Sequence, residues 1–248
     1  MTEDNVSNHA SALGEAVGGI LDDATLAVVK TASEDLGFVV KRSGDGSRLI
    51  LTDNDGNKYA IDIGIYDKSD APVIIVETKF LRYKKHMRDK GSWIAKAHYS
   101  LRRSHPSIRM CLSVLGGDWT KGSKEMLQST GETIIEIPMS HVVSVFEKEG
   151  VHLKWEETDR DTPKKSWEEF KGLTAGQKQK VGKDLLSIHK DLIVKTIKSA
   201  LSQNMSISKI KKIEFAIELE NGRTIVHRFP NEPEFAKFME TFDPENLG

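Results

Sequence analysis

The sequence predicts an α/β fold with a mixed central sheet and helices on both faces. Two features of the sequence order support this fold class. The first strands are joined by short turns, which is typical of an antiparallel meander. The later strands alternate with helices, which implies helical crossovers and parallel pairing. The composition, 38% hydrophobic and 29% charged residues, is that of a globular protein able to bury a sizeable core.

The first half of the chain is expected to hold two helical segments and four strands. Helices are predicted at 9–21, weakened by Gly18-Gly19, and at 24–35, ending at Gly37. The Asp-Gly pair in DNDGN at 53–57 favours a hairpin turn, and 67–71 is a second turn. The predicted strands are 38–42, 47–52, 59–66 and 72–80.

The next segment is expected to alternate helices and strands. Helices are predicted at 92–104, which stops before Pro106, and at 121–129 and 140–148; strands are predicted at 108–115 and 132–138. Together with the first half, this gives an αβββαβ core within a domain at 1–155. Such an order places the helices on both faces of one sheet.

The remaining residues, 156–248, are expected to form an accessory region for DNA contact or dimerisation. Residues 155–175 are polar and are interpreted as a linker. Thr174 and Gln177 have capping-box spacing and begin a long helix to about 203, followed by a hairpin around Asn221-Gly222 and a helix at 232–241. Two apolar stripes on the long helix predict more than one packing neighbour: Val181, Leu185, Ile188 and Leu192, and then Leu186, Ile193, Ile197 and Leu201.

Several classes of protein are excluded by what the sequence lacks. The single cysteine, Cys111, excludes a disulfide framework and a multi-cysteine zinc site, and its apolar flanks predict a core residue. The segment GDWTKGSK at 117–124 has the wrong residue order for a phosphate-binding P-loop. No apolar run approaches the roughly 20 residues that span a bilayer, and the polar N-terminus does not resemble a signal peptide. We therefore expect a cytoplasmic protein with no membrane contact.

The charge distribution points to an anionic partner. Residues 79–103 carry nine Lys or Arg against the single acid Asp89, although the whole chain has a net charge of −1. A local excess of this kind suggests contact with phosphates, although a solvated helix face is the simpler alternative. Seven of these residues are candidates for nucleic-acid contact: Arg82, Lys84, Lys85, Arg88, Lys90, Arg102 and Arg103.

The hydrophobic run PVIIVETKF at 72–80 ends in two opposite charges, Glu77 and Lys79. If strands 59–66 and 72–80 pair around the turn between them, Asp62 opposes Glu77, with Cβ atoms about 5 Å apart. Lys79 points to the same face because side chains alternate along a strand. Two close carboxylates repel unless a cation neutralises them, and oxygen ligands suit Mg²⁺. The carbonyl of Thr78 could add a ligand; the simpler alternative is an ordinary ion pair of Glu77 with Lys79.

This pattern resembles the PD-(D/E)XK nuclease superfamily over about residues 9–138. The resemblance rests on Asp62 and the triplet Glu77-Thr78-Lys79 on adjacent hydrophobic strands, within an αβββαβ order. It implies a restriction-endonuclease-like fold, metal ligation by Asp62 and Glu77, and a catalytic role for Lys79. Many members add a glutamate from the first helix, for which Glu15 is the candidate. Ile61 replaces the Pro of the family name, and the following helix offers only His98 and Tyr99 where a Gln or Tyr motif is frequent.

The resulting expectation is a Mg²⁺-dependent endonuclease, for which Mn²⁺ would substitute, acting on DNA rather than RNA in restriction, defence or repair. A homodimer is expected because many enzymes that cut duplexes use one site per strand. Two alternatives stay open: a nucleic-acid-binding or assembly protein that does not cleave, and a junction-resolving or RNA-processing relative.

Overall fold

The computed structural model describes residues 8–44, 48–83, 87–156, 158–202, 210 and 212–244. It divides the chain into two compact units, one ending at Ser202 and one beginning at Gln203. Within the described residues, no helix is both long enough and apolar enough to cross a membrane.

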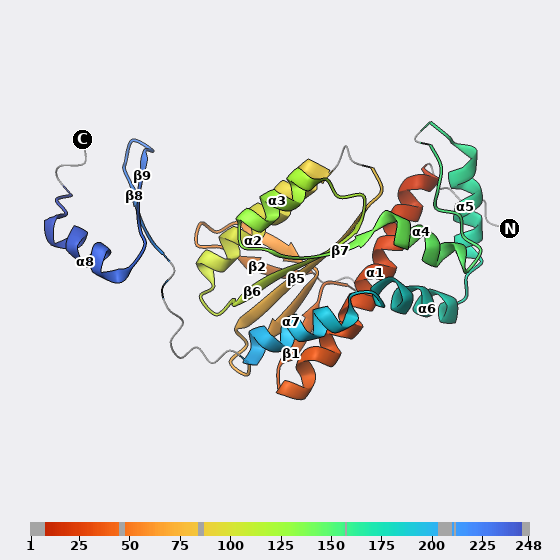
Figure 1. Cartoon of the computed structure of the whole chain (residues 1–248), viewed down its shortest axis with the longest axis horizontal. Helices are drawn as coiled ribbons and strands as arrows, with labels where there is room; N and C mark the ends of the chain where they lie inside the picture. The colour runs from red at the N-terminus through yellow and green to blue at the C-terminus, as the bar shows by residue number, and fades with distance from the viewer. Residues whose placement is uncertain are drawn as a thin grey trace. The chain divides into compact units, whose positions relative to one another are not determined.

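The first unit is built on a five-stranded sheet in the order β1-β4-β5-β6-β7 (Figure 1). β1, β4 and β5 pair antiparallel, whereas β5, β6 and β7 pair parallel. β5 is the central strand of the sheet. Its first five residues are all buried, as expected of an apolar strand that is covered on both faces. The strands are β1 (Val39–Arg42), β4 (Ile63–Tyr66), β5 (Pro72–Leu81), β6 (Met110–Gly117) and β7 (Thr133–Pro138).

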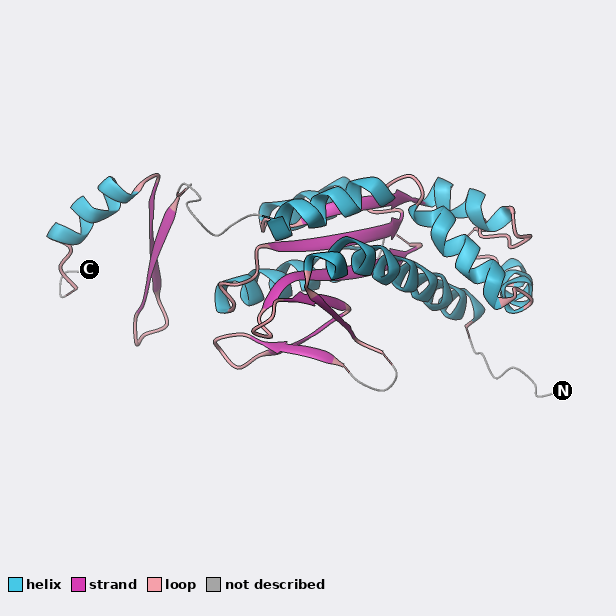
Figure 2. Cartoon of the chain, turned by 90° about the horizontal axis from the view of Figure 1, so that it is seen from below, coloured by secondary structure: helices cyan, strands magenta, loops and turns pink. Residues whose placement is uncertain are grey.

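Helices cover both faces of this sheet (Figures 1 and 2). On one face α1 (His9–Ser33), followed by the short η1 (Glu34–Leu36), contacts β5 and also packs against α5, α6 and α7. On the other face α2 (Met87–Ser104) contacts β5 and α3 (Lys121–Ser129). α4 (Met139–Glu147) follows β7, and its buried side chains belong to the same core as those of α1. The predicted α/β fold with a mixed, helix-flanked sheet is confirmed.

Two of the predicted elements near the N-terminus differ from the structure. The two expected helices are one continuous helix, α1, which runs through Gly18-Gly19. Tertiary packing overrides the low helix propensity of glycine here, because the buried face of α1 continues on either side of the pair. The expected strand 59–66 is two strands that separate at Asp62: β3 (Lys58–Ile61) pairs with β2 (Leu49–Thr52) in its own ribbon, and β4 joins the central sheet.

The predicted domain boundary near residue 155 does not match the structure. The region expected to be a linker contains α5 (Asp161–Lys171), and the expected long helix is divided into α6 (Ala175–Leu186) and α7 (Lys190–Ser202). The capping box of Thr174 with Gln177 is confirmed. These three helices belong to the first unit because their apolar side chains join the core under α1: Phe170, Val181, Leu185, Leu186, Ile193, Ile197 and Leu201. Ile188 and Leu192 stay exposed, since the break rotates them away from the stripe predicted for them.

The second unit is a hairpin followed by a helix, β8 (Ile213–Glu218), β9 (Thr224–Phe229) and α8 (Glu232–Thr241). The predicted turn at Asn221-Gly222 is confirmed, and Gly222 has the positive φ of 79° that favours glycine. Aromatic rings of the hairpin and helix pack together, with Phe229 and Phe238 centroids 4.9 Å apart. None of its described residues is fully buried, so the unit has only a small core of its own.

The position of the boundary can be tested by truncation. A chain that ends at Ser202 keeps the whole core of the first unit, so its thermal transition should fall close to that of the full chain. A chain that ends at Trp155 loses seven buried Val, Leu, Ile and Phe side chains of α5–α7, each of which contributes about 1.5–3 kcal/mol when buried. We expect this shorter chain not to fold, as measured by circular dichroism melting. A cooperative transition in the shorter chain would restore the boundary predicted from the sequence.

Candidate metal centre at the end of strand β5

The site begins with a bend at Asp62, where the chain leaves one pair of strands and enters another. Ile61 still pairs with Leu49 of the ribbon, whereas Ile63 pairs with Arg42 and Val76 of the central sheet. The predicted register is confirmed, since Ile63 opposes Val76 and Ile65 opposes Ile74. Asp62 stands one residue beyond this ladder, next to the end of β5 that carries the acidic and basic pair.

Thr78 joins the side chains of two aspartates from different elements. Its backbone N–H donates to Asp62 Oδ2 at 2.8 Å. Its hydroxyl lies 3.1 Å from Asp22 Oδ1 and 3.2 Å from Asp62 Oδ2. Thr78 therefore holds the two carboxylates close together, one from α1 and one from the bend before β4. The sequence had suggested the Thr78 carbonyl as a metal ligand, but it is the N–H and the hydroxyl that organise these acids.

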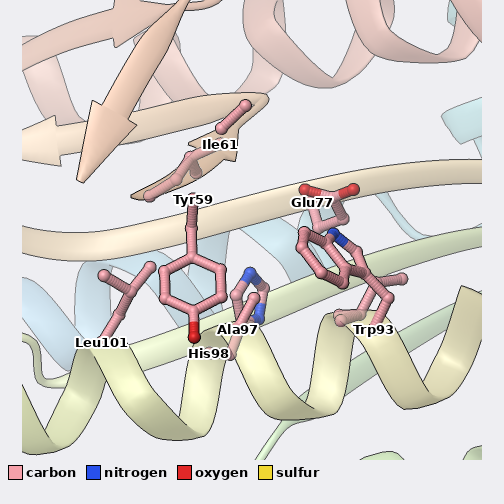
Figure 3. Close-up of a pocket in the computed structure, with 9 residues that line it drawn as sticks. Tyr59, Ile61, Glu77, Trp93, Ala97, His98 and Leu101 are labelled. Carbon is pink, nitrogen blue, oxygen red and sulfur yellow. The ribbon is translucent and has the colours of Figure 1, made fainter. Parts of the chain in front are cut away.

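Glu77 extends from the opposite face of β5 to that of Thr78. It lines a small void of about 10 Å³ together with Trp93 and His98 of α2 (Figure 3). Burial, and then the nearby Asp62 carboxylate, raise the pKa of Glu77 well above its usual range, against the opposing effect of Lys79. The pKa of Asp22 is also raised, first by burial and then by Asp62. The carboxyl groups are thus crowded and poorly hydrated, which is the environment that a bound cation relieves.

A cleft of about 810 Å³ opens over these groups. Asp22, Asp62, Thr78 and Lys79 line it, and so do Lys90 of α2 and Arg160 before α5. The N-terminal half of α1 forms one wall with small residues, among them Gly14 and Gly19. Asp22, Asp62 and Lys79 are therefore reachable from solvent through a cleft whose other charged side chains include basic ones, whereas Glu77 does not line it.

Asp22 was missed from the sequence, whereas Glu15 was expected. Both line the cleft, but Asp22 lies beside Thr78 and Asp62, and Glu15 is exposed about two turns away along α1. The seven-residue interval from Glu15 to Asp22 places them on the same face of a helix. This spacing could have identified Asp22 from the sequence, but only if α1 had been predicted as one continuous helix through Gly18-Gly19.

The basic residues predicted to contact phosphates have different roles in the structure. Arg82 donates to the carbonyls of Leu153 and Trp155, and its guanidinium lies 3.4 Å from the centroid of the Trp155 ring. Arg102 donates to the carbonyls of Thr130 and Gly131. These two arginines therefore bind the chain itself.

The other predicted phosphate contacts are more varied. Arg103 donates to the Tyr99 hydroxyl at 2.8 Å on the exposed side of α2. Arg88 and Lys90 are exposed at the start of α2 and make no ion pair with a described residue. Lys84 and Lys85 lie outside the described residues. Among the predicted residues that the structure describes, Arg82 and Lys90 line the cleft, and Lys90 is the exposed one of the two.

A second group of side chains lies buried on the α2 side of the sheet. The ligand atoms of His98, Cys111 and Glu132 are all within 4.8 Å of one another and could hold a metal ion. Without an ion the group is already hydrogen-bonded, since His98 Nδ1 lies 2.9 Å from Glu132 Oε2 and Ser113 donates to Glu132 Oε1 at 2.6 Å. Burial raises the pKa of the Cys111 thiol, which agrees with its predicted place in the core.

Comparisons add little to this picture. No family model matches the chain, and no curated protein is detectably similar to it. Among solved structures, the chain is similar to the crystal structure of a protein of unknown function, AF1548. The two are 12% identical with a TM-score of 0.33, over 68% of this chain and 97% of the other. Any function must therefore be inferred from the site itself.

The raised pKa of Glu77 predicts how the metal-free protein responds to pH. Because the folded state holds the Glu77 proton more tightly than the unfolded state, this group adds stability below its ordinary pKa of about 4.5. That contribution is lost as the pH rises through the folded pKa. Glu77→Gln cannot ionise, so it should melt at a higher temperature than the wild type at pH 8 in EDTA, and at a similar temperature at pH 4.

The matched control is Glu125→Gln on α3, a solvated carboxyl whose loss should move neither melting temperature. Addition of Mg²⁺ should stabilise the wild type at pH 8 and have a smaller effect on Glu77→Gln, because ligand binding to the folded state raises its stability. A Glu77→Gln variant that melts below the wild type at pH 8 would contradict the inferred crowding of carboxylates.

Proposed function

We propose that this protein is a metal-dependent nuclease that hydrolyses phosphodiester bonds, with DNA as the expected substrate and Mg²⁺ as the metal. The single observation that supports this is the convergence of the Asp22 and Asp62 carboxylates on Thr78, with Lys79 in the same open cleft and Glu77 close by on the opposite face of β5. The order of elements and the Asp62, Glu77 and Lys79 motif further suggest the restriction-endonuclease-like fold of the PD-(D/E)XK superfamily.

The residues present fit a hard divalent cation. Asp62 offers a carboxylate from the bend before β4 and Asp22 one from α1, both beside Thr78, while Glu77 offers a third from the opposite face of β5. Mg²⁺ prefers such oxygen ligands and retains waters that a phosphate can replace. In the described chain the compensating cations are Lys79 near Glu77 and Arg42, whose Nη2 lies 2.9 Å from Asp22 Oδ2. The pKa values of Asp22 and Glu77 stay raised despite them, so further positive charge is favoured.

The chemistry that the metal would supply is a more acidic bound water and stabilisation of charge on the phosphate. The chain's own residues would bind and position the reactants. Asp62 is held by the Thr78 N–H, so its ligating geometry is fixed before the substrate arrives. Lys79 would orient the attacking water, accept its proton or contact the scissile phosphate. Lys90 and Arg160 line the cleft and would attract neighbouring phosphates.

Cleavage assays on plasmid, single-stranded DNA and RNA test this proposal. Wild-type protein should cut at least one substrate in Mg²⁺ or Mn²⁺ and none in EDTA. Lys79→Ala should lower the rate by roughly 10²- to 10⁴-fold if it acts in proton transfer. Asp62→Asn should remove metal-dependent activity, because the site loses a ligand charge.

The matched control is Lys121→Ala, a lysine 88% exposed on α3, which should leave the rate unchanged. If wild type and Lys79→Ala are equally inactive on every substrate while binding nucleic acid, the protein is the non-cleaving binder kept as the alternative. Cleavage confined to branched DNA or to RNA would favour the junction-resolving or RNA-processing alternative.

The glycine wall of the cleft gives a further test. A Cβ at Gly19 would meet no atom within 4 Å, so the fold does not need glycine there. Gly19→Ala should therefore stabilise α1 by about 0.5–1 kcal/mol, because glycine is unfavourable inside a helix. If substrate approaches the wall closely, the same methyl group should slow cleavage, as measured by kcat/KM alongside a melting curve.

Gly122→Ala on α3 is the matched control, since a Cβ there also meets no atom within 4 Å and lies away from the cleft. It should leave kcat/KM unchanged. A Gly19→Ala variant with unchanged kcat/KM would show that substrate does not use this wall.

A further inference from the structure

Trp93 is an exposed aromatic side chain at the border of the proposed site. It is 56% exposed, although tryptophan usually buries much of its large apolar surface. One side of the ring approaches Tyr59, with centroids 5.9 Å apart and planes inclined by 49°. The same side chain lines the small void beside Glu77 (Figure 3). Trp93 is thus fixed on one side by Tyr59 and open to solvent on the other, next to a proposed metal ligand.

The helix that carries Trp93 is basic. α2 contains five Lys or Arg and one acid, Asp89. Lys96 follows Trp93 by three residues, which places the two side chains near each other on the helix. Arg88, Lys90 and Lys96 are exposed and make no ion pair with a described residue. Cations without acidic partners beside an exposed indole are complementary to a chain of phosphates that carries flat, apolar bases.

We propose that Trp93 stacks against an unpaired base of the strand that enters the site, so that the substrate is single-stranded or contains an unpaired nucleotide near the scissile phosphate. Within a duplex both faces of each base are covered by their neighbours, and only an unpaired or extruded base offers a face to an indole. Base stacking on an aromatic side chain next to backbone-binding cations is the usual means of holding single strands. This inference rests on the proposed function for the position of the strand, but the stacking can be measured without cleavage.

The test is the affinity of dye-labelled oligonucleotides, measured by fluorescence anisotropy in Mg²⁺. The protein carries Lys79→Ala, which should slow cleavage enough that few strands are cut during the measurement. The probes are a single-stranded DNA, the RNA of the same sequence and the corresponding DNA duplex. Trp93→Ala should weaken binding of at least one single strand by roughly 5- to 100-fold, the range expected for loss of one stacked base. Trp93→Phe should retain most of the affinity, and duplex binding should change less than about twofold.

Leu192→Ala is the matched control, because Leu192 is another exposed apolar residue, 49% exposed on α7, and its loss should change no affinity. A second readout is the intrinsic tryptophan fluorescence, which single strands should quench in the Trp93 protein and not in Trp93→Phe. The stacking inference is overturned if no single strand binds, if Trp93→Ala binds single strands within twofold of its parent, or if single strands and duplex weaken equally.

These outcomes separate the stacking inference from the proposed function. Binding through Trp93 by a protein that never cleaves would remove the nuclease assignment and keep the stacking site. Cleavage that is unchanged by Trp93→Ala would keep the nuclease assignment and remove the stacking site. A larger effect on the DNA strand than on the RNA strand, or the reverse, identifies which nucleic acid the site accepts.

Discussion

The bend at Asp62 is the constraint on which the candidate site depends. At this residue the chain passes from the β2–β3 ribbon to the central sheet, and both ladders lose their regular partners. Ser43 compensates for the loss: its hydroxyl donates to the Ile61 carbonyl at 2.6 Å and accepts from the Leu49 N–H at 2.7 Å. Its own N–H donates to the Asp62 carbonyl at 2.9 Å. Because the backbone groups are satisfied in this way, Asp62 can leave the strand direction and reach Thr78.

The close approach of these acidic side chains destabilises the folded protein when no cation is bound. Three acidic side chains are brought near one another, and burial together with the neighbouring Asp62 carboxylate raises the pKa values of Asp22 and Glu77. A structural role would be served as well by neutral side chains, since a buried pair of like charges destabilises the folded state. Perturbed acids of this kind gather at functional sites, where a ligand or metal supplies the missing charge. The proposed metal therefore explains a feature that packing does not.

The sequence predicted the parts of this site that depend on local rules. The turn between β4 and β5 and the apolar run of β5 sufficed to set the register of Ile63 with Val76 and Ile65 with Ile74. The predicted pairing of Asp62 with Glu77 on one face was wrong, because the chain bends at Asp62 and its carboxylate accepts from Thr78. Asp22 was not predicted, because Gly18-Gly19 suggested a helix end and only packing against β5, α6 and α7 shows that α1 continues. The prediction of a linker and one long helix for residues 156–202 was partly wrong for a similar reason. The polar sequence of α5 suggests a linker, and its burial against α1 is a tertiary effect.

The net charge of the basic segment could be counted from the sequence, but the contacts that its individual side chains make could not be predicted. Arg82 and Arg102 donate to backbone carbonyls of later segments, so they hold the loops around the sheet in place. The exposed cations that make no ion pair with a described residue, Arg88, Lys90 and Lys96, lie between positions 88 and 96 of α2, the stretch that also carries Trp93. Dissolved salt screens charges that lie more than about 10 Å apart. A phosphate bound in the cleft would therefore interact with this local group of cations and not with the net charge of the whole segment. The segment thus combines arginines that bind the chain itself with cations that are open to solvent.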